Sequence, residues 1–300
     1  MNTRGKRILV TGGAGYIGSK LIEKLTALKY DVINVDLKET LANVPTEIAS
    51  VTDRHRLRQV FEKFLPQVVV HCAGGTAISY KQDPVREFNI QFVGTQNIVN
   101  ASNETGCEKI ILLSSDHVYI GFNEDDEVDE RVDLKFTMNP HDTNFRHLFG
   151  FSKSISEMVC LKSFKNSIIF RLASIYGTGE CSNLIKGMIH EARRTEQITI
   201  WGDGSRRVQF TYLPDIINLM VHAMDMESGI YNIANGKRIK LIDVAREISK
   251  RLNVDYVINE DKPEGPRFPY VSNHKILSTV HDFSFTQFSI GLEKILEDLQ

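Results

Sequence analysis

A glycine-rich segment near the start of the chain has the residue types that hold a phosphate. Residues 11–19, TGGAGYIGS, follow an apolar run and open an amphipathic one, which is the strand-to-helix context in which such a match is meaningful. Glycines let the backbone turn tightly and come close to a pyrophosphate, and the first amides of the helix can then donate to its oxygens. The glycines concerned are Gly12, Gly13, Gly15 and Gly18. The pattern predicts a dinucleotide site.

An acidic residue further along narrows the choice of cofactor. Asp36 ends the second apolar run, at the position where a carboxylate accepts hydrogen bonds from both ribose hydroxyls of an adenosine. Because the same charge repels a 2′-phosphate, we predict NAD rather than NADP. Asp53 opens the next helix. It could be only a helix cap, and we favour a contact with the adenine amino group.

The elements that must position these residues follow a regular order. Up to about residue 175, short apolar runs alternate with amphipathic segments of helical length, which is typical of βαβ units around a parallel sheet. We expect strands at 7–11, 31–36, 67–73, 109–115 and 167–173, and helices at 16–28, 53–64, 84–104, 150–163, 184–194, 214–226, 241–252 and 286–298. The prediction is an α/β fold: a Rossmann-type doubly wound parallel sheet over residues 1–175, interleaved with a smaller C-terminal α/β substrate lobe over 176–300.

Composition excludes several classes of protein. The 36 Lys and Arg against 38 Asp and Glu give a net charge of -2, so no overall charge attracts nucleic acid or an anionic membrane. No apolar run approaches the roughly 20 residues that span a bilayer. The four cysteines lack zinc-site spacing and no secretory signal precedes them, which predicts no metal and a cytoplasmic location. The acidic run EDDEVDER at 124–131 is expected to be a solvated loop.

Further segments occur in the order typical of one enzyme family. They are VVHCAGG (69–75), SSDHVY (114–119), GFSK (150–153), RLASIYGTG (171–179), WGDGSRRVQFTYLPD (201–215), GIYNIANG (229–236) and PRF (266–268). With TGGAGYIG and Asp36, they make the chain resemble, over nearly its whole length, the extended short-chain dehydrogenases/reductases that are nucleotide-sugar epimerases and dehydratases. The resemblance implies a permanently held NAD that takes a hydride from a sugar hydroxyl, leaving a transient 4-ketone, and later returns it. It implies cofactor contacts from Gly12, Gly15, Tyr16, Ile17, Gly18, Ala73 and Lys153.

The family's base is replaced in this chain. The resemblance implies a tyrosine four residues before a lysine, whose phenol takes the proton of the sugar hydroxyl. Lys153 is present, but Phe149 stands at the tyrosine position and its ring carries no hydroxyl. One interpretation is natural loss, which leaves a feeble enzyme or a non-catalytic protein that binds NAD and a nucleotide sugar. The other is an engineered inactive form of the enzyme.

Three neighbouring residues could compensate. Ser115 matches the family's serine or threonine, and Asp116 and His117 follow it at the end of the expected fourth strand, where α/β proteins place ligands. In dTDP-glucose 4,6-dehydratases the three residues resemble Thr-Asp-Glu, an acid and a base for elimination, and an imidazole can also take a proton near pH 7. In UDP-galactose 4-epimerases the last two positions are small and uncharged. Asp116 and His117 thus favour dehydration, family frequency favours 4-epimerisation, and we place epimerisation slightly ahead.

An acidic nucleotide sugar, a UDP- or dTDP-hexose, needs local cations. Arg206, Arg207 and Arg267 can each offer a two-pronged hydrogen bond to a diphosphate. Ser174 stands where relatives often have an asparagine that contacts the sugar nucleotide. The resemblance also implies a homodimer formed through the helices at 84–104 and 150–163.

Overall fold

The structure, a computed structural model, describes residues 5–136, 144–179 and 183–299. The chain divides into two compact units. Unit 1 takes Met1–Gly121, Asp133–Leu172 and Ile216–Asn232, and unit 2 takes Phe122–Val132, Ala173–Asp215 and Ile233–Gln300. The chain therefore passes between the units more than once.

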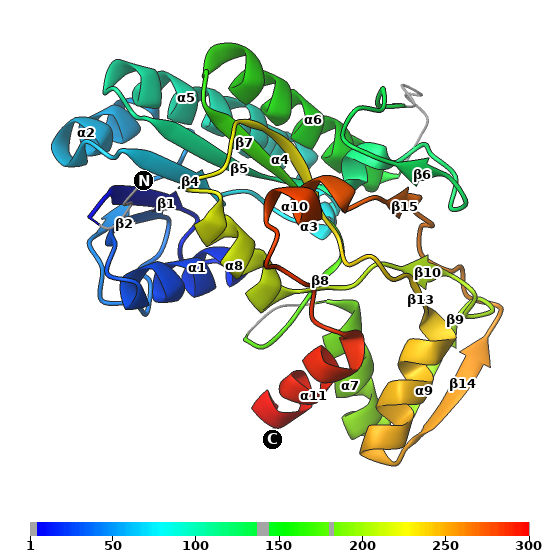
Figure 1. Cartoon of the computed structure of the whole chain (residues 1–300). Helices are drawn as coiled ribbons and strands as arrows, with labels where there is room; N and C mark the ends of the chain where they lie inside the picture. Colours follow the sequence, from blue (N-terminus) through cyan, green and yellow to red (C-terminus); the bar gives the residue numbers. More distant parts are fainter. Residues whose placement is uncertain (1–4, 137–143, 180–182, 300) are drawn as a thin grey trace. The chain divides into compact units, whose positions relative to one another are not determined.

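Unit 1 is built on a seven-stranded sheet (Figure 1). Its strands are β1 (Arg7–Thr11), β2 (Asp31–Asp36), β3 (Thr46–Ile48), β4 (Val68–His71), β5 (Lys109–Ser115), β7 (Ser167–Leu172) and β12 (Gly229–Ile233). Their order is β12-β7-β5-β4-β1-β2-β3, and the pairs from β7 to β3 are parallel. Central strands such as β4, VVVH, are buried throughout because helices cover both faces. The predicted Rossmann-type doubly wound sheet is confirmed.

Helices cover the two faces of this sheet. They are α1 (Tyr16–Ala27), α2 (Arg54–Phe64), α3 (Ala77–Gln82), α4 (Pro84–Asn89), the π-helical turn η1 (Ile90–Gly94), α5 (Thr95–Glu104), the 3₁₀ turn η2 (Asp116–Tyr119), α6 (Phe145–Ser163) and most of α8 (Leu213–His222). Figure 1 shows α2, α5 and α6 on one face and α1 on the other. Leu57 and Phe61 of α2, Ile98 of α5 and Cys160 of α6 share one buried apolar cluster. This packing holds α6 against the sheet.

The order of the strands reverses between β1 and β4, and parallel sheets bind ligands at such a point. The loops that follow the two strands meet there. Gly12, at φ +73°, lies so close to the loop after β4 that a Cβ would be 2.7 Å from the amide nitrogen of Ala73. Only glycine permits both this backbone conformation and this approach. A side chain at position 12 would push the two loops apart.

Unit 2 is made of short strand pairs and helices. The strands are β6 (Glu127–Val128), β8 (Ile175–Tyr176), β9 (Gln197–Trp201), β10 (Arg207–Val208), β11 (Thr211–Tyr212), β13 (Ile239–Lys240), β14 (Asp255–Asn259) and β15 (Tyr270–Val271), and the helices are α7 (Leu184–Thr195), α9 (Leu241–Leu252), α10 (His274–Thr279) and α11 (Phe288–Asp298). Tyr176, Phe210 and Tyr212 lie in its apolar core. The pairs are β6 with β15, β8 with β11, β9 with β14 and β10 with β13.

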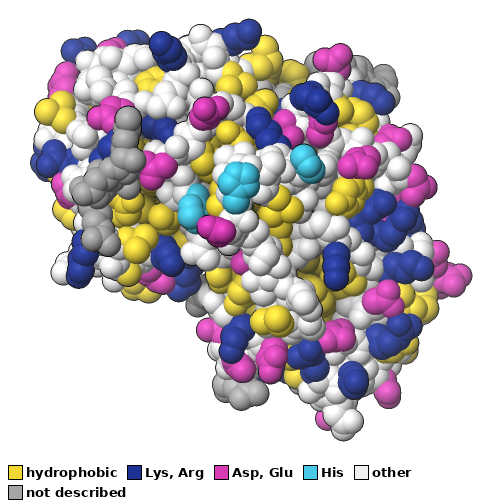
Figure 2. Space-filling model, in the orientation of Figure 1, with side chains coloured by type: hydrophobic (Ala, Val, Ile, Leu, Met, Phe, Trp, Pro, Cys, Tyr) yellow, Lys and Arg dark blue, Asp and Glu magenta, His cyan; other side chains and the backbone are white. Residues whose placement is uncertain are grey.

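Across the described ranges, no helix is long and apolar enough to cross a membrane, and no cluster of His, Cys, Asp or Glu there could hold a metal ion. Cys72, Cys107 and Cys160 are free thiols, and Cys181 lies outside the described residues. Basic and acidic side chains are interspersed on the face drawn in Figure 2.

Candidate active site

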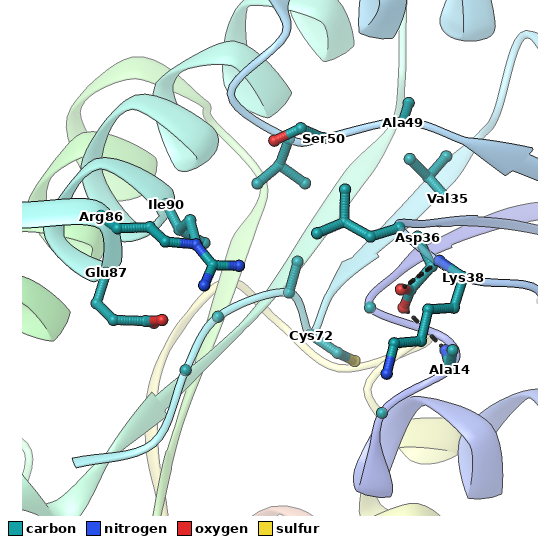
Figure 3. A pocket seen from close by; sticks show the side chains of 17 residues that line it. Ala14, Val35, Asp36, Lys38, Ala49, Ser50, Cys72, Arg86, Glu87 and Ile90 are labelled. Carbon is teal, nitrogen blue, oxygen red and sulfur yellow. Dashed lines mark hydrogen bonds between the residues drawn. The ribbon is translucent and has the colours of Figure 1, made fainter. Parts of the chain in front are cut away.

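A cavity of about 330 Å³ opens in unit 1 where the strand order reverses. The glycine loop, the end of β2, the segment after β4 and helix α4 form its walls. Figure 3 shows Asp36 and Lys38 on one side and Arg86 and Glu87 on the other. The full lining is Gly12, Ala14, Gly15, Val35, Asp36, Leu37, Lys38, Ala49, Ser50, Val51, Cys72, Ala73, Gly74, Gly75, Arg86, Glu87 and Ile90.

The carboxylate of Asp36 is tied to the glycine loop. Its Oδ2 accepts from the amide of Ala14 at 2.9 Å and its Oδ1 accepts from the amide of Lys38 at 3.2 Å. A carboxylate oxygen has more than one lone pair, so Asp36 can also accept from ribose hydroxyls. A glycine loop beside β1 and an acceptor at the end of β2 fit a dinucleotide.

The predicted cofactor residues take different places. Gly12, Gly15, Asp36 and Ala73 line the cavity. Gly18 instead packs under the loop, where a Cβ would lie 2.2 Å from the carbonyl oxygen of Gly12. Tyr16 and Ile17 begin α1, and neither they nor Lys153 are among the residues that line the cavity.

Asp53 has the role of a helix cap. Its Oδ1 accepts from the amide of Arg56 at 3.0 Å, which satisfies one of the free donors at the start of α2. The residue of this segment that lines the cavity is Ser50. The cap predicted as one alternative for Asp53 is present, and its contact with the adenine amino group stays a prediction.

Ser115, Asp116 and His117 form one hydrogen-bonded cluster at the end of β5. Ser115 Oγ lies 3.2 Å from Asp116 Oδ1 and 3.2 Å from His117 Nδ1, and His117 Nδ1 lies 3.1 Å from Asp116 Oδ1. The side chains of Asp116 and His117 are 11% and 20% exposed. A hydroxyl, an imidazole and a carboxylate in mutual contact can pass a proton from one to the next.

Helix α6 brings Phe149 to this cluster. The ring centroids of Phe149 and His117 are 5.1 Å apart in an edge-to-face arrangement. Gly150 permits the approach, because a Cβ there would lie 2.2 Å from the carbonyl oxygen of His117. Lys153, four residues after Phe149 and on the same side of the helix, has its Nζ 5.7 Å from the centre of the Phe149 ring. The family's tyrosine position, its lysine and the imidazole are thus neighbours.

Lys153 is almost fully buried. Its Nζ donates to the carbonyl oxygen of Leu113 at 3.0 Å. Burial lowers the pKa of Lys153 to about 8, and the nearby Cys72, Glu157 and Glu87 oppose part of that shift. The ammonium group is therefore held at a cost to stability.

We expect the unfolding free energy to depend on pH through Lys153. Its folded pKa of about 8 lies below the ordinary value of 10.5, so between these values the unfolded chain binds more protons than the folded chain. The unfolding free energy should rise with pH across that window by up to roughly 3 kcal/mol. Urea unfolding between about pH 7 and 11 measures it. Lys153→Met should lack the rise, whereas Lys162→Met, an exposed site on the same helix, should keep it; parallel curves for wild type and Lys153→Met would contradict the assignment.

A buried ion pair fixes α6 to the sheet. Arg171 Nη2 of β7 lies 2.6 Å from Glu157 Oε2 of α6, with both side chains under 5% exposed. Ser114 Oγ donates to Glu157 Oε1 at 2.5 Å, and Arg171 Nη1 donates to Tyr119 Oη at 2.9 Å. Because these partners come from β5, β7, η2 and α6, the network sets where Phe149 and Lys153 stand.

The arginines predicted to bind a diphosphate lie in unit 2, and two of them pair with Glu124. Arg267 Nη1 is 2.7 Å from Glu124 Oε2, and the Arg207 amide donates to Glu124 Oε1 at 2.9 Å. Arg267 also pairs with Glu264 at 2.6 Å and Arg207 with Asp125 at 2.5 Å. The carboxylate of Glu124 is 11% exposed. The expectation of a solvated acidic loop is therefore wrong at its first residue, because ion pairing compensates the burial of that charge.

The other two predicted substrate residues, Arg206 and Ser174, make different contacts. The Arg206 amide donates to Glu264 Oε1 at 3.1 Å. Ser174 is exposed, and its carbonyl oxygen accepts from the amide of Thr211 at 2.8 Å. Its side chain has the polarity, but not the length, of the asparagine expected at that position.

Sequence reasoning missed one wall of the cofactor cavity. Glu87 and Arg86 line it from α4, and Gln91, in the next turn, is also buried. The signal was present in the helix predicted at 84–104: Glu87, Gln91 and Thr95 recur at intervals of four, which puts polar groups on one face of a helix. All three are buried.

Comparison with known proteins identifies the family. Residues 8–234 match the model of the NAD dependent epimerase/dehydratase family, and the chain belongs to it. The family is NAD dependent, in agreement with the predicted cofactor.

Relatives with assigned reactions span several conversions of nucleotide sugars. UDP-glucuronic acid decarboxylase 2 of Arabidopsis thaliana is 24% identical over 92% of this chain, and the chain spans 65% of that protein's length. The dTDP-D-glucose 4,6-dehydratase of Mus musculus is 29% identical over 89% of this chain and 81% of its own length. The solved structure of MoeE5 in complex with UDP-glucuronic acid and NAD is similar in fold, with a TM-score of 0.84, 21% identity and 98% of both chains covered.

Proposed function

We propose that the chain converts a nucleoside-diphosphate sugar, a UDP- or dTDP-hexose, through a transient 4-ketone, and that its reaction is 4-epimerisation. The observation that carries the proposal is the contact of His117 with both Ser115 and Phe149. It supports an enzyme over a non-catalytic binding protein, because a base stands beside the position of the missing phenol. Bound NAD supplies the acceptor that takes a hydride from carbon four and returns it.

In this proposal His117 takes the place of the family's tyrosine. Ser115 Oγ takes the proton of the sugar hydroxyl while its own proton moves to the unprotonated His117 Nδ1, 3.2 Å away, as the hydride leaves carbon four. Lys153, buried next to the Phe149 ring, supplies positive charge on the same side. The proton returns along the same path when the ketone is reduced on its other face.

The mutual hydrogen bonds of the cluster favour epimerisation. Asp116 Oδ1 lies within hydrogen-bond distance of both Ser115 Oγ and His117 Nδ1. It therefore accepts from Nδ1 once the imidazole has taken the proton of Ser115, and the three groups act on one hydroxyl. Inversion at carbon four needs one such base, whereas elimination needs an acid and a base that reach two different carbons. Dehydration is the second candidate, favoured by the presence of a carboxylate and an imidazole after Ser115.

Product analysis tests the function. The protein is incubated with UDP- and dTDP-hexoses, and the products are examined by NMR and mass spectrometry. We expect an isomer of unchanged mass, inverted at carbon four, with no net accumulation of NADH. A product lighter by one water would make the second candidate correct. Binding of NAD and of a sugar nucleotide without any product would contradict catalysis and support a binding protein.

We also propose a homodimer formed through the segments at 84–104 and 150–163. Met158 and Leu161 are exposed apolar residues on α6, and burying them would favour association. Sedimentation of the wild type and of Met158→Lys tests this, since a charge there should shift a dimer toward the monomer.

A further inference from the structure

The cavity wall formed by α4 contains a buried carboxylate oxygen without a partner. Glu87 is 6% exposed and lines the cavity, and its Oε2 has no hydrogen-bond partner. Figure 3 shows this side chain across the cavity from Asp36. Buried polar atoms are nearly always satisfied in folded proteins, so Glu87 Oε2 is an acceptor for something that enters the cavity.

A donor without a partner lies one helical turn further on. Gln91 is 1% exposed, and its Nε2 has no hydrogen-bond partner. Gln91 belongs to the π-helical turn η1, and such turns are rare and frequent at functional sites. The two side chains thus present a free acceptor and a free donor from the same stretch of helix.

Both side chains face the loop that follows β4. A Cβ at Gly75 would lie 2.0 Å from Glu87 Oε2, and a Cβ at Gly74 would lie 2.1 Å from Gln91 Nε2. Glycine at both positions therefore leaves the polar atoms room beside the backbone that lines the cavity. The arrangement depends on all four residues.

Glu87 stands at the end of the cavity away from the adenosine acceptor (Figure 3), and Gln91 lies behind the cavity wall, next to Gly74, which lines it. Asp36 marks the adenosine end. Glu87 acts electrostatically on Lys153 and on Tyr80, and these two residues pack on Phe149. Glu87 is therefore on the side of the cavity nearest the proposed reacting groups.

We propose that Glu87 and Gln91 bind the nicotinamide-riboside half of NAD, the carboxylate accepting and the amide donating a hydrogen bond. The proposal rests on the proposed function, because it takes the cavity as the site of that cofactor. The ligand group must carry both a donor and an acceptor. A ribose hydroxyl and the carboxamide of the nicotinamide both do.

Calorimetric titration of Glu87→Gln with three ligands tests whether Glu87 binds the ribose hydroxyl or the nicotinamide carboxamide. ADP has only the adenosine end, ADP-ribose adds the second ribose, and NAD⁺ adds the nicotinamide. We expect Glu87→Gln to lower the affinity for NAD⁺ by about tenfold to 10²-fold, since a hydrogen bond to a charged group is lost. The affinity for ADP should change by no more than about twofold. Weaker binding of ADP-ribose as well assigns the ribose, and weaker binding of NAD⁺ alone assigns the carboxamide.

Controls keep the test decisive. Glu104→Gln changes an exposed glutamate of α5 and should bind all three ligands as the wild type does. Glu87→Asp keeps the charge on a shorter side chain and should also lower the affinity for NAD⁺ more than that for ADP. It takes the place of Glu87→Gln if that variant does not fold. Equal weakening of ADP and NAD⁺, or no change in either, would overturn the role of Glu87. Failure of the wild type to bind NAD⁺ would overturn the proposed function itself.

Discussion

Replacing His117 by asparagine is expected to lower turnover of the nucleotide sugar by roughly 10² to 10⁴-fold, the range for loss of a general base. Asparagine keeps a polar group of similar size beside Ser115 but cannot take a proton. The imidazole lies against Phe149 with ring centroids 5.1 Å apart. A tyrosine at 149 therefore brings a phenol into the same place, and Phe149→Tyr should reduce the cost of His117→Asn to less than about tenfold.

Four proteins measure this coupling: the wild type, His117→Asn, Phe149→Tyr and the double variant. Turnover is followed by product formation, and binding of NAD and sugar nucleotide is measured separately. His55→Asn changes an exposed histidine of α2 and should leave turnover unchanged. Equal losses from His117→Asn in both backgrounds would contradict a shared role for His117 and the missing phenol.

Phe149→Tyr alone also separates the interpretations of position 149. In an enzyme blocked or weakened at that position, the phenol beside Lys153 should raise turnover. In a binding protein whose other groups have lost their function, the variant should stay inactive although NAD and the sugar nucleotide bind.

Arg171→Met is expected to lower the unfolding free energy by about 3–5 kcal/mol, because it leaves the Glu157 carboxylate buried without its cation. Glu157 is 3% exposed, and its side chain would keep only the hydrogen bond from Ser114. Tyr119 Oη, which accepts from Arg171 and donates to Asn232, would lose one partner as well. The hydrogen-bonded network that holds α6 against the sheet would therefore weaken.

Urea unfolding of three variants tests this. Arg58→Met, at an exposed ion pair of α2, should change the unfolding free energy by no more than about 1 kcal/mol. The double variant with Arg171→Met and Glu157→Met should regain most of the loss, since replacing both members of a buried pair by apolar residues is often close to neutral. A loss as large in the double variant as in Arg171→Met would place the cost in packing rather than in the unpaired charge.

The regular elements of unit 1 were largely predictable from local pattern. The strands expected at 7–11, 31–36 and 109–115 have those bounds in the structure, and α9 matches the helix expected at 241–252. Buried parallel strands and amphipathic helices carry their period in the sequence itself. The helix expected at 84–104 is interrupted by the π-helical turn η1. The periodicity of apolar residues does not predict such a turn, because its extra residue depends on packing against other elements.

The sequence alone was enough to assign the glycine loop, Asp36, Lys153 and position 149 to the site. Glycine spacing, a carboxylate at the end of a strand and a four-residue helical interval are properties of neighbouring residues. Tertiary structure alone decided the rest. Ser50 came to line the cavity, Glu124 paired with Arg207 and Arg267, and Glu87 and Gln91 came to face Gly75 and Gly74. Such roles depend on which distant backbone removes water from a polar atom and which group then replaces the water, and neither is written in the spacing of nearby residues.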